Sequence, residues 1–149
     1  MERQSSIHVP YRDERDIETV VRRFEACDFA PTEFTHGAHL TVALWYLARL
    51  PSEAAAGRMR EGLRRFLAHH GLATGYHETI TLFWLKLVRR FLDGQADGRA
   101  LTDITNEMLA TCSDSKLLFE YYSRELVQSE RAVSEWIEPD LKSLKDAWG

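Results

Sequence analysis

Apolar residues recur every three or four positions along most of the chain, which is the spacing of one buried face on an α-helix. This repeat predicts five to six helices, over about residues 13–26, 32–50, 53–70, 76–93, 100–110 and 116–129. The last of these continues at helical spacing to Ile137 and ends before Pro139. Thr32 and Ser52 are the expected N-caps of the second and third helices.

The same pattern predicts the fold class. No segment alternates apolar and polar residues as a half-buried strand does, and the chain contains no internal repeat. We therefore predict an all-α fold, a compact bundle of five to six helices, with residues 1–149 in a single domain and residues 1–12 as an irregular N-terminal segment. The fourth helix is apolar over much of its circumference, so it is either the central helix of the bundle or the contact of a homodimer.

The composition is that of an ordinary globular protein, because 44% of the 149 residues are hydrophobic. Lys and Arg number 19 against 23 Asp and Glu, a net charge of -4, so nucleic acid is not an expected partner. Cys27 and Cys112 lack the spacing of a zinc ribbon, and the polar first residues do not form a secretory signal. The longest apolar stretch, Leu40–Leu50, is too short to span a membrane. We expect a cytoplasmic protein without a membrane partner.

The segment EFTHGAHLTVALWY places polar side chains inside an apolar helix. Glu33, His36 and His39 follow one another at intervals of three, so they share one face, and Tyr46 lies two turns beyond His39. A buried polar group needs a partner, because leaving it unpaired costs several kilocalories per mole. Such residues are therefore the first candidates for a functional site.

A second segment, GYHETITLFW, brings a third histidine to the start of the fourth helix. His77 and Glu78 lie in its first turn, and Thr81 and Trp84 continue the face of His77. A third segment carries Tyr122 among core leucines, where a tyrosine hydroxyl either bonds a neighbour or orients a substrate. These residues extend the candidate site across three helices.

Neutral imidazole is a good ligand for zinc, iron, copper or nickel, so the histidines predict a metal site in the bundle core. The predicted ligands of one divalent transition metal are His36, His39 and His77, with Glu33 as a fourth. Glu33-x-x-His36 matches the Glu-x-x-His element of di-iron bundles, but no second copy follows, which favours a single metal. The predicted catalytic and substrate-binding residues are Glu78, Tyr46 and Tyr122, and Thr81 and Trp84, respectively.

Three functional hypotheses follow from this constellation. The first is a metalloenzyme acting on a small molecule by hydrolytic, lyase or oxygen-dependent chemistry. The second is a metal-free isomerase, lyase or cyclase that uses the same His, Tyr and Glu side chains for acid–base catalysis. The third is a non-enzymatic helical binding protein, in which His77 caps its helix and His36 and His39 lie half exposed near a helix N-terminus or pair within the core.

The segments FTHGAHL, GYHETIT and YYSRELVQSERAVSEWIEPDL, in this order, resemble a family of small bacterial proteins, most of them uncharacterised. The resemblance extends over most of the chain and implies a helical single domain in which His36, His39 and His77 belong to one constellation. It implies no particular reaction. The DinB-like metal bundles are similar in size and in using three histidines, although their ligand order differs from the H-x-x-H pattern here.

Overall fold

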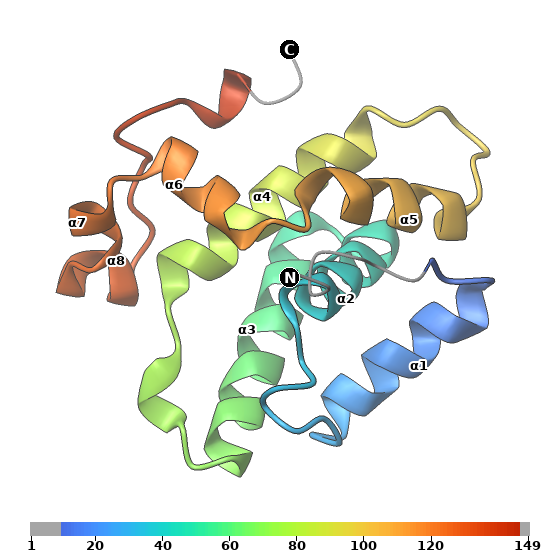
Figure 1. Cartoon of the computed structure of the whole chain (residues 1–149), viewed down its shortest axis with the longest axis horizontal. Helices are drawn as coiled ribbons and strands as arrows, with labels where there is room; N and C mark the ends of the chain where they lie inside the picture. Colours follow the sequence, from blue (N-terminus) through green and yellow to red (C-terminus); the bar gives the residue numbers. More distant parts are fainter. Residues whose placement is uncertain (1–9, 147–149) are drawn as a thin grey trace, which may run out of the picture.

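The structure, a computed structural model, describes residues 10–146, and helices make up 69% of these residues (Figure 1). Five helices of twelve or more residues form the bundle: α1 (Glu14–Glu25), α2 (His36–Arg49), α3 (Ser52–His69), α4 (Glu78–Asp93) and α5 (Leu101–Cys112). Shorter helical turns complete it: η2 (Ala73–Gly75), η3 (Ser115–Leu117), α6 (Leu118–Tyr121), α7 (Arg124–Val127), α8 (Glu130–Ser134) and η4 (Leu144–Asp146). No strand occurs within the described residues, and the predicted all-α bundle is confirmed.

Helix α2 is the centre of the bundle and contacts α1, α3, α4 and α5 (Figure 1). It is apolar around most of its circumference, and Leu40, Val42 and Leu44 are fully buried although they point in different directions. Helix α4 packs along it and on its other side contacts α8. A homodimer through the fourth helix stays a prediction. Across residues 10–146, no helix is both long and apolar enough to cross a membrane.

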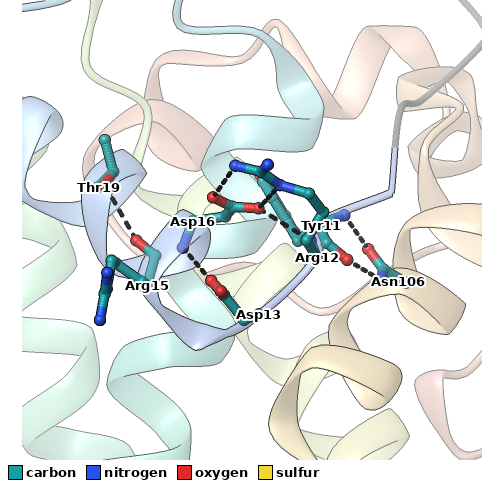
Figure 2. Close-up of polar contacts among 7 residues, drawn as sticks. All are labelled: Tyr11, Arg12, Asp13, Arg15, Asp16, Thr19 and Asn106. Carbon is teal, nitrogen blue, oxygen red and sulfur yellow. Dashed lines mark hydrogen bonds and ion pairs between the residues drawn. The ribbon is translucent and has the colours of Figure 1, made fainter.

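The chain enters α1 through a short segment that is pinned to the rest of the bundle. Two hydrogen bonds join Tyr11 to Asn106 of α5. The backbone N–H of Tyr11 donates to Oδ1 of Asn106 (2.9 Å), and Nδ2 of Asn106 donates to the backbone carbonyl of Tyr11 (3.0 Å). Figure 2 shows this pair beside the Asp13 carboxylate, which accepts the N–H of Asp16 and caps α1. Of the predicted irregular segment 1–12, residues 1–9 lie outside the described part of the chain, and the last three residues are not helical.

Helix α2 begins at His36, so the predicted cap at Thr32 is wrong. The cap is Thr35, whose hydroxyl accepts the N–H of Ala38. Residues 30–34 form a separate turn because Phe34 is drawn into the core, where its ring stacks on Phe24 at a centroid distance of 4.7 Å. The predicted cap at Ser52 is also wrong, because α3 starts one position earlier than predicted and Ser52 is its first residue.

The predicted long helix over 116–129 is also wrong, because the chain breaks into three short helices there. Tyr122 is extended, and Ser123 and Ser129 each cap a new helix by accepting the N–H of Leu126 and Ala132. Serine hydroxyls compete with the helix backbone in this way, which the apolar spacing does not reveal. The result is a C-terminal segment that folds back over the start of α4 (Figure 1).

Thr79 fastens this segment to α4. Its buried hydroxyl donates to the carbonyl of Glu135 (2.7 Å) and accepts the N–H of Ile137 (3.2 Å). The Tyr122 hydroxyl also donates to the carbonyl of Ile137, at 2.5 Å. These bonds pair backbone groups of a non-helical stretch that is half-buried or exposed, and they hold it against the start of α4.

Candidate functional site

A pocket of about 620 Å³ lies where α2, α3 and α4 come together. Its walls come from the first two turns of α2, the middle and end of α3, the first two turns of α4 and the η3–α6 segment. Its rim is formed by exposed residues: Pro31, Leu72, Gly75 and Ser115. This volume lies within the range of small-molecule sites, roughly 300–1,000 Å³.

The pocket wall is apolar and rich in aromatic rings. The rings come from five separate places in the chain: Phe34, Phe66, Tyr76, Trp84 and Phe119. Within residues 10–146, no Asp, Glu, Lys or Arg lines this pocket. Its polar side chains lie mainly on one wall, where α2 packs against α4.

Five residues predicted from the sequence meet at this pocket: His36, His39, His77, Thr81 and Trp84. They meet because α2 and α4 lie against each other and both begin near the pocket. The three histidines differ, however, in what their ring nitrogens bond.

His77 is the N-cap of α4, and both of its ring nitrogens have partners. Nδ1 accepts the N–H of Ile80 (3.1 Å), and Nε2 donates to the carbonyl of Val127 in α7 (2.7 Å). A carbonyl only accepts, so the ring is the Nε2-protonated tautomer and its single lone pair serves the cap. His77 is therefore a structural link between α4 and α7, and a metal ion at this ring would have to displace one of these bonds.

His36 is the first residue of α2 and bonds a different segment. Its Nε2 donates to the carbonyl of Cys112 at 3.2 Å, and its ring lies edge-on to Trp84 at a centroid distance of 4.3 Å. Burial lowers the pKa of His36, against the opposing effects of this hydrogen bond and of Asp114. At neutral pH the ring is thus uncharged, with its Nδ1 lone pair unused by the described residues.

His39 lies one turn further along α2 and stacks on Phe34 at a centroid distance of 4.0 Å. Burial, together with the neighbouring His36, lowers the pKa of His39 to about 4. Neither ring nitrogen has a hydrogen-bond partner among residues 10–146. A neutral imidazole at the pocket wall therefore keeps one donor and one acceptor for a ligand.

The predicted carboxylates lie outside the pocket lining. Glu33 is exposed, accepts the N–H of Ala30 (2.7 Å) and approaches Arg23. Glu78 forms a two-bond ion pair with Arg60 (2.7 and 3.0 Å), which lowers the pKa of its carboxyl, and accepts the hydroxyl of Tyr76. The structure does not bring either carboxylate together with the histidines.

The two predicted tyrosines also lie elsewhere. The Tyr46 hydroxyl donates to Glu25 of α1 at 2.6 Å, and burial and this carboxylate raise the pKa of Tyr46. Tyr122 is fully buried and bonds the carbonyl of Ile137, and burial raises its pKa. Both hydroxyls hold neighbouring segments together, and for Tyr122 this is the structural alternative that the sequence left open.

Sequence reasoning missed several pocket residues. Phe66 reads as part of an ordinary apolar stripe, and Phe34 and Phe119 belong to segments whose backbone path the periodicity does not predict. The one sequence signal that could have found them is the aromatic content of these segments.

In the described part of the chain, no group of three or more His, Cys, Asp or Glu side chains is arranged to hold a metal ion. Comparisons of this chain with protein-family models, with curated proteins and with solved structures give no match. The function is therefore argued from the pocket itself.

Proposed function

We propose that this protein binds a small, uncharged and largely apolar organic molecule in the pocket between α2, α3 and α4. The observation that carries the proposal is a ring-lined cavity of about 620 Å³ whose lining, among residues 10–146, includes histidines but no Asp, Glu, Lys or Arg. An apolar ligand gains about 25 cal/mol for each Å² that it removes from water. A charged ligand would lose its hydration without meeting a countercharge.

The neutral state of the two α2 histidines supports binding more than proton transfer. An efficient general base has a pKa near the working pH, whereas the pKa of His39 is lowered to about 4. The carboxylates and tyrosines expected to assist it bond other parts of the fold. These observations favour the hypothesis of a non-enzymatic binding protein over that of a metal-free acid–base enzyme.

The metalloenzyme hypothesis stays a prediction with its own test. His36 and His39 can each offer one lone pair, but the lone pair of His77 serves the helix cap. Metal content after incubation with zinc, iron, copper or nickel and dialysis is to be compared between the wild type and His36→Ala/His39→Ala. One equivalent in the wild type and none in the folded variant would favour a metal site over the organic pocket.

The binding proposal is tested with N-phenyl-1-naphthylamine, an uncharged dye that fluoresces in apolar sites. We expect saturable binding by the wild type. Ile80→Trp places a large ring in the pocket and should weaken binding at least tenfold. Leu82→Trp is the matched control, because Leu82 is also half-buried on α4 but lines a separate groove beside Lys86 and Arg89.

Far-UV circular dichroism establishes that both variants are folded. Equal loss of dye binding in the two variants, or no binding by the wild type, would contradict the proposal.

A further inference from the structure

We infer that the ligand of this pocket is a neutral aromatic compound with a hydroxyl group, which is held at the wall formed by His36, His39 and Thr81. The inference rests on the proposed binding function and specifies the chemical class of the ligand. It follows from two features of the wall: where its rings lie, and which of its hydrogen-bond donors are already used.

Aromatic rings border the pocket from several directions. Phe34 and Phe66 approach each other at a centroid distance of 5.1 Å, and the Trp84 ring on α4 lies edge-on to His36. Tyr76 closes another side, with its hydroxyl fixed by Glu78 and its ring under the guanidinium of Arg64. A flat aromatic ligand can make offset or edge contacts with such rings, which favours it over a flexible aliphatic chain.

The polar wall has used most of its donors internally. The Nε2 proton of His36 goes to the carbonyl of Cys112, and the Thr81 hydroxyl proton goes to the carbonyl of His77 at 2.8 Å. These two groups therefore present lone pairs. His39 adds one N–H and one lone pair, and Trp84 adds an indole N–H.

A hydroxyl group matches this wall because it donates one hydrogen bond and accepts others. An ether or ketone can accept but cannot donate to the imidazole nitrogens. A carboxylate also only accepts, and no cation lines the pocket within residues 10–146. A ligand oxygen that faces a lone pair of the pocket wall loses its hydrogen bonds to water and gains none in return.

Isothermal titration calorimetry at pH 7 with three probes tests the ligand class. The probes are 2-naphthol, 2-methoxynaphthalene and 2-naphthoate, which share one ring system and differ only in the polar group. We expect 2-naphthol to bind about tenfold more tightly than the ether, and the carboxylate to bind most weakly. In His39→Phe the advantage of the naphthol over the ether should fall to about threefold or less, because the lone pair that accepts the naphthol proton is lost.

His69→Phe is the matched control, because His69 lies exposed at the end of α3 and does not line the pocket. His36→Phe is the second variant if His39→Phe does not fold. Equal affinity of naphthol and ether for the wild type, or tightest binding of the carboxylate, would overturn the inference and leave the binding function standing. Failure of all three probes to bind would overturn the proposed function as well.

Discussion

The role of each histidine in this fold follows from what its ring nitrogens meet. His77 and His39 both line the pocket, yet His77 has a partner on each nitrogen whereas His39 has none in the described part of the chain. The partner of His77 on α7 lies 50 residues away in sequence. A local pattern shows the residue type and the helix face, but it does not show such a distant carbonyl.

Replacing His77 tests its structural role. His77→Ala removes the cap of α4 and leaves the carbonyl of Val127 without its donor, so the free energy of unfolding should fall by about 2 kcal/mol. His77→Asn keeps a side chain that can cap the helix and should recover roughly half of this loss. Urea unfolding measures both variants. No loss in His77→Ala would show that the two bonds do not stabilise the fold.

The low pKa of His39 predicts a pH-dependent stability. Between pH 4 and 6.5 the unfolded chain binds the proton that the folded ring does not, so the free energy of unfolding rises as the pH rises through this range. The contribution is on the order of 3 kcal/mol and is complete above pH 6.5. His39→Phe should flatten the curve by this amount. Urea unfolding at several pH values would contradict the account if both proteins show the same slope.

At the scale of helices, the apolar spacing predicts the five long helices. It fails where a contact of one side chain decides the path of the backbone. The bounds of α1 and the C-terminal ends of α3 and α4 lie within one residue of the predicted ranges. Helix α2 starts late because Phe34 is pulled into the core, and the C-terminal helix is divided by Ser123 and Ser129. Both exceptions depend on side-chain contacts and not on apolar spacing.

Two glycines on α3 make a matched pair. A Cβ at Gly62 would lie 2.5 Å from Cε2 of Phe24, whereas a Cβ at Gly57 would meet nothing within 4 Å. Gly62→Ala should therefore lower the free energy of unfolding by about 1–3 kcal/mol, because α1 must shift. Gly57→Ala should raise it by roughly 0.5–1 kcal/mol through helix propensity. Thermal unfolding of both variants measures these changes. An equal gain in stability in the two variants would contradict the close packing of α1 on α3.

Thr79 carries the attachment of the C-terminal segment to α4. Thr79→Val leaves the carbonyl of Glu135 and the N–H of Ile137 unpaired, so stability should fall by about 1–3 kcal/mol. The rate of hydrogen exchange at the backbone amides of residues 130–137 should increase in the same variant. Thr111→Val is the control, since the exposed hydroxyl of Thr111 bonds only Glu107 of its own helix. Unchanged exchange in Thr79→Val would mean that other contacts hold the segment.

For the whole molecule, the sequence predicts the all-α bundle and the meeting of the histidines, but not the pocket. His36 and His39 share a face of the central helix, and His77 begins the helix packed against it, so their proximity follows from two local patterns. The pocket itself depends on three segments that converge only after folding: the turn with Phe34, the end of α3 and the start of α6. Glu33 shares a face with His36 and His39 in the predicted helix, and Glu78 directly follows His77. In the structure both carboxylates lie outside the pocket lining, since Glu33 approaches Arg23 and Glu78 pairs with Arg60.

We propose that the neutral rings of His36 and His39 serve a ligand in the pocket, whereas His77 serves the fold. Long-range proton–nitrogen NMR spectra of the ring nitrogens, recorded at pH 7 with and without 2-naphthol, test it most directly. We predict neutral rings at His36 and His39, with Nε2 of His36 and of His77 carrying the proton of its hydrogen bond, and ligand-induced shifts at His36 and His39 that greatly exceed those at His77. A charged His39, or spectra that do not change with ligand, would contradict the account.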